Sequence, residues 1–345
     1  MPFEHARGLA FRPPQEWRRV SVIESHAAGE PLRVVLDGIA PIPGDTIVAK
    51  RAWAREHLDG LRRGLMFEPR GHADMYGAIV TEPATPDADL GVLFMHNEGW
   101  STMCGHGIIA LTTVALETGM LSPRDVVRID APAGRITARP KRDGDRVTSV
   151  AFENVPSFVL ELDASVEVPG LGRIRYDLAF GGAFYAYVDV AQVGLSMTAK
   201  DYRGLIDTGW RIKKAVMASR PIPHPFEAEL SFLYGTIFTG PALDPGGDSR
   251  NVCVFADGEV DRSPTGTGVS GRVAIEHARG RLAPGKPLVV ESIIGTRFTG
   301  RVARETTFGP HRAVVPEVEG SAWISGRSEL WFDPSDPLNE GFILR

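Results

Sequence analysis

The sequence predicts an α+β protein built from two similar halves, and three observations carry this prediction. Short runs rich in Val, Ile, Phe and Tyr dominate the 345 residues and are bounded by turn residues, which is typical of β-strands. Stretches with helical periodicity are fewer. The segment 104–134 recurs at 265–295 in nearly unchanged register. We therefore expect mostly antiparallel sheet wrapped around a few helices.

The expected elements follow from these patterns along the chain. The runs expected as strands are, in order, VSVIE, LRVVL, GAIVTE, LGVLFMH, VVRID, ITARP, VTSVAF, FYAYVDV, VCVFA, LVVESII, HRAVVPEV and SELWF. Their β-branched and aromatic residues suit a half-buried pleated surface. Helices are expected at 50–61, 105–118, 198–219 and 266–279, where apolar residues recur with helical spacing.

The repeat aligns a turn, a helix, a glycine stop and two strands with their second copies. An offset of 161 residues pairs Cys104 with Thr265, Gly105 with Gly266, Gly107 with Gly268, Gly119 with Gly280, Leu121 with Leu282, Pro123 with Pro284, Asp130 with Glu291 and Gly134 with Gly295. Glycine stops are common at helix ends, but they do not explain a register held over the whole segment. We expect one half to cover residues 1–160 plus about 328–345, and the other 161–327.

Composition and charge narrow the possible partners. The formal charge of −5 comes without a basic block, which argues against nucleic acid and anionic membranes. The chain has no run of 18 apolar residues, and its first 19 residues lack the apolar region of a secretory signal. Two cysteines make no disulfide framework, so a reducing cytoplasm is the simplest compartment. We expect a small molecule as the partner.

Cys104 stands directly before Gly105-His106-Gly107, at the start of an expected helix. The first turn of a helix carries unpaired N–H groups and the positive end of the helix dipole. Such a terminus binds an anion, for example a substrate carboxylate, and lowers the pKa of a thiol placed there. The alternative is a buried, inert cysteine, which is the role expected for Cys253 inside an apolar strand. We interpret Cys104 as a thiolate base or nucleophile.

One sequence match points to a different function. Residues 266–271, GTGVSG, fit the G-x-G-x-x-G pattern of nicotinamide oxidoreductases, and Glu291 follows at a suitable distance. That pattern needs a strand directly before its first glycine, but a polar loop ending in Pro264 stands there. The copy at 105–110 nearly fits too, so both are better explained as anion-binding helix starts. The nine histidines show no metal-ligand spacing, and we expect neither metal nor cofactor.

The motifs MCGHG at 103–107 and DRSPTGTG at 261–268 resemble those of the proline racemase family, within the diaminopimelate-epimerase-like fold. Other segments also fit the family: ESHAAGEPLRVV, in which Ala28 replaces a glycine, EPRGHADMYGA, GGAFYAYVD and DPLNEGFILR. The resemblance implies two pseudo-symmetric domains, each a β half-barrel around a central helix, with the active site in the cleft between them. It also implies a homodimer.

In racemases of this family both helix starts carry a cysteine. One thiolate removes the Cα proton, and the opposite thiol delivers a proton to the other face. Here Thr265 occupies the second position. A hydroxyl is far too weak an acid to replace a thiol at neutral pH. The resemblance therefore implies that Cys104 forms the Cα carbanion, whereas the far face cannot readily be protonated.

The carbanion must then react in another way. On a proline ring it can expel a leaving group from C3. A 3-hydroxyl fits, whereas a 4-hydroxyl is one carbon too far for direct elimination. Loss of water gives a Δ2-pyrroline that tautomerises to Δ1-pyrroline-2-carboxylate. The Cys104/Thr265 pair also resembles that of trans-3-hydroxy-L-proline dehydratases, so we expect such a hydro-lyase. The alternatives are a proline racemase or 4-hydroxyproline 2-epimerase, and a non-catalytic amino-acid-binding protein.

The resemblance implies roles for further residues. Cys104 would accept the Cα proton, and Asp261 would contact the ring nitrogen, where an anion beside an ammonium is favourable. Helix-start N–H groups and side chains would hold the carboxylate, and these belong to Gly105, His106, Gly266 and Thr267. Thr265 and His106 are both candidates for protonating the departing hydroxide.

Overall fold

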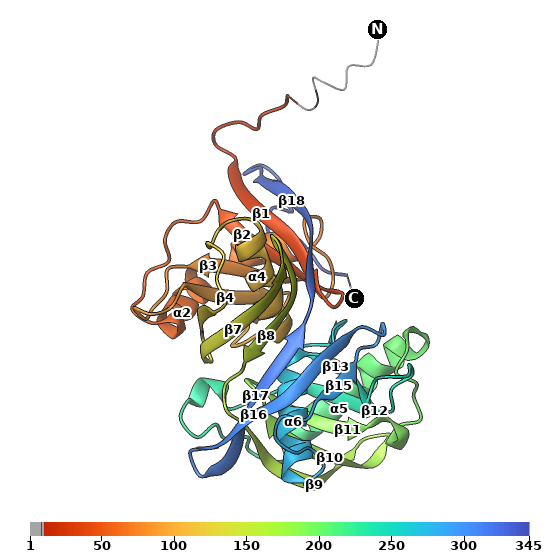
Figure 1. Cartoon of the computed structure of the whole chain (residues 1–345). Coiled ribbons are helices and arrows are strands. Elements are labelled where there is room, and N and C mark those ends of the chain that lie inside the picture. The colour runs from red at the N-terminus through yellow and green to blue at the C-terminus, as the bar shows by residue number, and fades with distance from the viewer. Residues whose placement is uncertain (1–7, 9, 345) are drawn as a thin grey trace.

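The computed structural model describes residue 8 and residues 10–344. Residues 1–7, 9 and 345 lie outside the described residues, and they include part of the segment in which we expect no secretory signal. In the described chain, eighteen strands form one hydrogen-bonded network. The network wraps around two helices, α4 (Gly105–Glu117) and α6 (Gly266–Ala278), which lie in the upper and lower parts of the molecule (Figure 1).

The strands are β1 (Arg18–Ala27), β2 (Glu30–Asp37), β3 (Tyr76–Thr81), β4 (Leu90–His96), β5 (Gly99–Trp100), β6 (Val127–Ala131), β7 (Gly134–Asp143), β8 (Arg146–Glu153), β9 (Ser157–Val168), β10 (Gly172–Phe180), β11 (Phe184–Asp189), β12 (Leu233–Gly240), β13 (Ser249–Phe255), β14 (Glu259–Asp261), β15 (Leu288–Glu291), β16 (Arg297–Phe308), β17 (His311–Gly320) and β18 (Ala322–Phe332). The other helices are α2 (Ile47–His57), α3 (Asp59–Met66) and α5 (Tyr202–Ser219), with short 3₁₀ turns η1 (Val190–Gln192), η2 (Ala199–Asp201) and η3 (Ala228–Leu230). No helix of residues 8 and 10–344 is long and apolar enough to span a membrane.

The strand pairing occurs twice along the chain, as the repeat in the sequence predicts. In the first copy β1–β2 is antiparallel, β2–β3 parallel, β3–β4 antiparallel and β4–β6 parallel. In the second copy β10–β11, β11–β12, β12–β13 and β13–β15 follow the same order. Strand β17 pairs with both β8 and β9 and so joins the two copies.

The central helices are buried because they are apolar around most of their circumference. Helix α4 is buried from Gly105 to Leu116 and packs against β1, β8 and β18. Helix α6 packs in the same way against β9, β16 and β17. A separate apolar cluster, which includes Leu65 and Met66, lies between α2, α3 and the adjoining strands. The expected helices at the repeat are thus the cores around which the strands are arranged.

Several expected elements differ in the structure. The helix expected at 50–61 is two helices, because the chain breaks at Leu58 (φ −118°, ψ 9°), and α2 begins earlier, after the Thr46 cap. The helix expected at 198–219 begins with η2 and becomes α-helical at Tyr202. Strands β9, β10 and β12 were not expected. Charged residues on the outer faces of β9 and β10 hide their apolar alternation, and β12 contains glycines.

Helices α4 and α6 meet start to start. A Cβ on Gly105 would lie 2.5 Å from the Cα of Gly266, and a Cβ on Gly266 would lie 2.6 Å from the Cα of Gly105. Real Cβ atoms do not approach other atoms so closely. Glycine at both positions is therefore what lets the two N-termini open onto one common site.

Ala28, the residue that departs from the family's glycine, lies in the left-handed region at φ 53°. This conformation costs a residue with a Cβ roughly 1–2 kcal/mol.

We expect Ala28→Gly to stabilise the protein by roughly 0.5–1 kcal/mol, since the relief of strain exceeds the added entropy of the unfolded chain. Ala27→Gly, at the buried end of β1, is the matched control and should destabilise. Thermal unfolding measures both, and equal destabilisation by the two would contradict the strain assignment.

Candidate active site

The residues predicted for the site all border one small cavity at the starts of α4 and α6. They are Cys104, Gly105, His106, Asp261, Thr265, Gly266 and Thr267. The free volume of about 20 Å³ holds little more than one water molecule. A molecule of proline size needs several times this space, so the cavity must widen to admit it. The structure brings the predicted residues together, while their individual roles remain predictions.

Cys104 is the N-cap residue of α4. Its backbone is extended (φ −142°, ψ 106°), and its Sγ accepts a hydrogen bond from the Gly107 N–H at 3.2 Å. The same sulfur lies 3.2 Å from Nδ1 of His106 and 3.5 Å from its Nε2. The cap geometry therefore places the thiol beside an imidazole at the N-terminus of α4.

Burial raises the pKa of the Cys104 thiol well above its usual value, and the Gly107 N–H opposes this rise only in part. The nearby Asp261 raises the pKa further. The prediction that the helix start lowers this pKa is thus wrong for the closed cleft without substrate, because the loss of hydration outweighs one N–H group. At neutral pH the resting sulfur carries its proton.

His106 is neutral in the same environment. Burial lowers the pKa of His106 to about 4, although Asp261 and a hydrogen bond to the Pro31 carbonyl favour the charged form. The ring stands edge-on to Tyr76, with 4.9 Å between the ring centroids. A neutral imidazole has one ring nitrogen without a proton, which can accept the proton of the Cys104 thiol. The arrangement is a buried thiol–imidazole pair packed against Tyr76.

Thr265 occupies the matching position at α6, but with a different geometry. Its φ is 68°, which is rare for a β-branched residue, and its side chain accepts no N–H of the helix. A Cβ on Gly268 would meet the Thr265 methyl at 3.2 Å, whereas a Cβ on the matching Gly107 would meet the Cys104 sulfur at 2.8 Å. The methyl group of Thr265, and not its hydroxyl, therefore corresponds to the Cys104 thiol.

The hydroxyl of Thr265 points away from that position. Oγ1 is buried and has no hydrogen bond of normal geometry within the described chain. It is nevertheless near enough to the Cys253 thiol to oppose the rise in pKa that burial causes there. Cys253 is buried, as predicted for a core residue, but it also borders the cavity.

Asp261 and Thr267 are both buried and both are held by hydrogen bonds. Asp261 Oδ1 accepts from the Ser263 N–H at 2.7 Å, and Ser263 Oγ accepts from the Thr265 N–H at 3.1 Å. Thr267 Oγ1 and the Tyr185 hydroxyl are 2.8 Å apart. These contacts order the turn between β14 and α6 before any ligand enters.

Six further residues border the cavity and were not predicted for the site: Tyr76, Met103, Tyr185, Tyr234, Cys253 and Phe255. Tyr76 and Tyr185 lie in segments that resemble the family, which could have indicated them. Tyr234 and Phe255 reach the cavity from strands β12 and β13. No local pattern marks them, because only the pairing of the strands brings them to the site.

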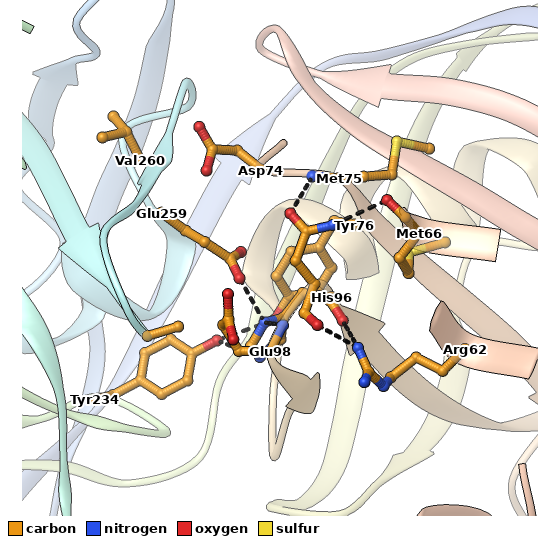
Figure 2. A network of polar contacts seen from close by, with 12 residues as sticks. Arg62, Met66, Asp74, Met75, Tyr76, His96, Glu98, Tyr234, Glu259 and Val260 are labelled. Atoms are coloured by element: carbon orange, nitrogen blue, oxygen red, sulfur yellow. Dashed lines mark hydrogen bonds and ion pairs between the residues drawn. The ribbon is translucent and has the colours of Figure 1, made fainter. Parts of the chain in front are cut away.

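A polar network connects the cavity wall to a buried contact between His96 and Glu259 (Figure 2). Nδ1 of His96 on β4 lies 3.1 Å from Oε1 of Glu259 on β14. The Tyr234 hydroxyl is 3.4 Å from Nε2 of His96 and 3.4 Å from the Tyr76 hydroxyl. The network joins strands from both copies of the repeat and fixes the two tyrosines above the cavity. Within residues 8 and 10–344, no group of three His, Cys, Asp or Glu residues could hold a metal ion.

The raised pKa of Cys104 predicts how its alkylation depends on pH. Iodoacetamide reacts with the thiolate, so labelling of the ligand-free protein should be slow at neutral pH and should still increase above about pH 8.5, the usual thiol range. Mass spectrometry measures the label on Cys104, and Cys104→Ser is the control for labelling elsewhere. A plateau reached below neutral pH would show that the helix start lowers the pKa after all.

Comparison with known proteins identifies the family. The family model for proline racemase matches residues 22–343. The chain is 52% identical to a trans-3-hydroxy-L-proline dehydratase from Azospirillum brasilense, over 95% of this chain and 99% of that protein. It is 51% identical to a 3-hydroxyproline 2-epimerase from Burkholderia multivorans, with the same coverage of 95% and 99%.

Solved structures agree with this placement. A hydroxyproline epimerase from Agrobacterium vitis with bound trans-4-hydroxy-L-proline superimposes with a TM-score of 0.90 and 34% identity, over 96% of each chain. A PhzF-family protein from Bacillus anthracis, at 11% identity over 90% of this chain and 99% of that one, shares the fold alone with a TM-score of 0.57. With its two helix-start motifs at one cavity and a family match along nearly its whole length, the chain belongs to the proline racemase family and has the diaminopimelate-epimerase-like fold.

Proposed function

We propose that the protein is a cofactor-independent hydro-lyase that dehydrates trans-3-hydroxy-L-proline to Δ1-pyrroline-2-carboxylate. The observation that carries the proposal is the asymmetry of the two helix starts. One presents the Cys104 thiol, and the other presents the Thr265 methyl group where a second thiol would lie. The name of the relative from Azospirillum brasilense supports the same reaction.

In the proposed reaction Cys104 is the base. The substrate carboxylate binds the free N–H groups at the two helix starts, with His106 and Thr267 beside it, where an anion is favoured. Asp261 binds the ring ammonium. That ammonium adds positive charge beside the sulfur, which lowers the raised pKa of Cys104 and favours the thiolate. The thiolate removes the Cα proton, and the helix-start N–H groups stabilise the charge that develops on the carboxylate.

Thr265 determines the fate of the carbanion. A racemase needs an acid on the face opposite the base, and Thr265 offers only a methyl group and a hydroxyl too weak to serve. The carbanion therefore expels the 3-hydroxyl. Epimerisation at Cα is the second candidate, because a relative of equal coverage is named 3-hydroxyproline 2-epimerase.

One assay separates the candidates. The pure protein is incubated without cofactor with trans-3-hydroxy-L-proline, L-proline and trans-4-hydroxy-L-proline. The dehydratase forms pyrroline from the first compound only and leaves the configuration of the other two unchanged. Inversion at Cα of any of the three would identify an epimerase or racemase, and binding without conversion would identify a binding protein.

We also infer a division into two domains, at 1–160 plus about 328–345 and at 161–327, each a half-barrel around its central helix. The repeated strand pairing and the packing of α4 and α6 support this division. β17 works against a sharp boundary, since it pairs with strands from both copies. A homodimer and a cytoplasmic location remain predictions.

Cys104→Ser should lower pyrroline formation from trans-3-hydroxy-L-proline by about 10³-fold or more, because a serine hydroxyl is a far weaker acid and leaves no base at neutral pH. The change preserves volume, and the Gly107 N–H can still bond the new oxygen. Circular dichroism and thermal unfolding check that the variant folds. A folded serine variant with wild-type turnover would refute the assignment of the base.

Thr265→Cys should add a weak exchange or epimerisation at Cα of L-proline. The cysteine has room because its sulfur can occupy the place of the present methyl, over Gly268. Dehydration of trans-3-hydroxy-L-proline should persist in part, since Cys104 is unchanged. Proton NMR in D₂O and chiral chromatography measure the two effects. If the variant binds L-proline and shows neither, other residues exclude racemisation.

A further inference from the structure

We propose that the elimination is syn and that His106 delivers the proton to the departing hydroxyl, on the same face of the ring from which Cys104 removes the Cα proton. This inference rests on the proposed function and adds the acid that completes the reaction. It also decides between the two candidates that the sequence left open, His106 and Thr265.

The stereochemistry of the substrate requires a syn elimination. In trans-3-hydroxy-L-proline the hydroxyl at C3 and the carboxylate at C2 lie on opposite faces of the ring. The Cα hydrogen lies opposite the carboxylate, and so it shares a face with the hydroxyl. A base that removes this hydrogen therefore approaches the face from which the hydroxyl leaves. The acid is needed beside Cys104 and not across the ring.

His106 is the group that the structure places there. Its Nδ1 lies 3.2 Å from the Cys104 sulfur, and both side chains border the cavity. The imidazole is 4% exposed and its ring packs edge-on against Tyr76, so its orientation is held. Being neutral, the ring can take a proton from Cys104 and pass it on. The contact for this transfer is already present in the structure without substrate.

Thr265 lies at the start of the opposite helix and is poorly placed for the same task. Its methyl group occupies the position that matches the Cys104 sulfur, while its hydroxyl lies near Cys253. A ring held between the two helix starts turns its hydroxyl-bearing face to Cys104. Thr265 then shapes the opposite face and keeps a proton donor away from it.

The proton balance closes with water as the only other reagent. Substrate binding first releases the proton of the resting Cys104 thiol to water, because the ring ammonium favours the thiolate. The thiolate takes the Cα proton, the released electron pair forms the C2–C3 double bond, and the C3–O bond breaks with its pair on oxygen. Cys104 passes the Cα proton to a nitrogen of His106, and the imidazolium gives a proton to the departing oxygen, which leaves as water. This restores the thiolate and the neutral imidazole, and the sulfur takes a proton back from water when the product leaves. The enamine product then moves its N–H proton to C3 and becomes the imine.

The test compares two leaving groups. Hydroxide needs a proton to leave, whereas fluoride is a weak base and leaves without one. For His106→Gln we expect kcat for trans-3-hydroxy-L-proline to fall by about 10²–10⁴-fold, the usual contribution of a general acid. Fluoride release from trans-3-fluoro-L-proline, measured with a fluoride electrode, should fall by less than about tenfold, because Cys104 still removes the Cα proton.

Two variants serve as comparisons. Cys104→Ser should lose both reactions, because the base is common to them. Thr265→Val removes the rival hydroxyl and keeps the shape, and it should leave the ratio of hydroxyl to fluoride elimination near that of the wild type. The proposal is overturned if both rates fall equally in His106→Gln, or if the ratio changes in Thr265→Val instead.

The wild-type protein gives a test that needs no folded variant. In cis-3-hydroxy-L-proline the hydroxyl lies on the face opposite the Cα hydrogen and so faces Thr265. We expect its dehydration to be slower than that of the trans isomer by at least about 10²-fold, the value of a missing general acid. Equal rates would overturn the syn assignment. A wild-type protein that converts neither isomer would instead refute the proposed dehydratase function.

Discussion

The contact between Gly105 and Gly266 is the constraint on which the rest of the site depends. Two helices can direct their first N–H groups at one small ligand only if their N-termini nearly touch, and a Cβ on either residue would collide with the Cα of the other. The strands around α4 and α6 bring the two starts together. Buried polar contacts then fix the approach: Glu30 on β2 pairs with the Arg262 side chain at 2.9 Å, and Nδ1 of His96 lies 3.1 Å from Oε1 of Glu259.

The two helix starts are similar, but one carries Cys104 and the other carries Thr265. This single difference makes the two faces of the site chemically unequal. Cys104 has an ordinary extended cap conformation and directs its sulfur at the helix start and at His106. Thr265 has a left-handed backbone, which costs a β-branched residue roughly 1–3 kcal/mol, and it turns its methyl group to the same place. The second helix start is therefore present with a different backbone, and the group that would protonate the far face is missing. A carbanion formed in this cleft is therefore directed toward elimination.

The parts of the site that the sequence could predict are those carried by contiguous motifs. Cys104 to His106 lie at the start of one helix, and Asp261 to Thr267 lie before and at the start of the other. The repeat pairs Cys104 with Thr265, and the resemblance to the family indicates His106, Asp261 and Thr267. Tyr234 and Phe255 could not be found this way, because β12 and β13 place them at the cavity through long-range pairing. The protonation state of Cys104 could not be predicted from the sequence either. A helix start suggests a low pKa, but the burial that raises it appears only when both halves close over the sulfur.

Only the Cys104 side of the bound ring should be able to exchange a proton with Cα. Hydrogen exchange in D₂O tests this most directly. The wild-type protein is incubated separately with L-proline and D-proline, which have no leaving group at C3, and the Cα–H signal is followed by NMR with chiral analysis of the product. We expect L-proline to exchange its Cα hydrogen for deuterium with retention of configuration, and D-proline to remain unchanged. Interconversion of the two enantiomers would show a competent acid on the Thr265 face and would contradict the account.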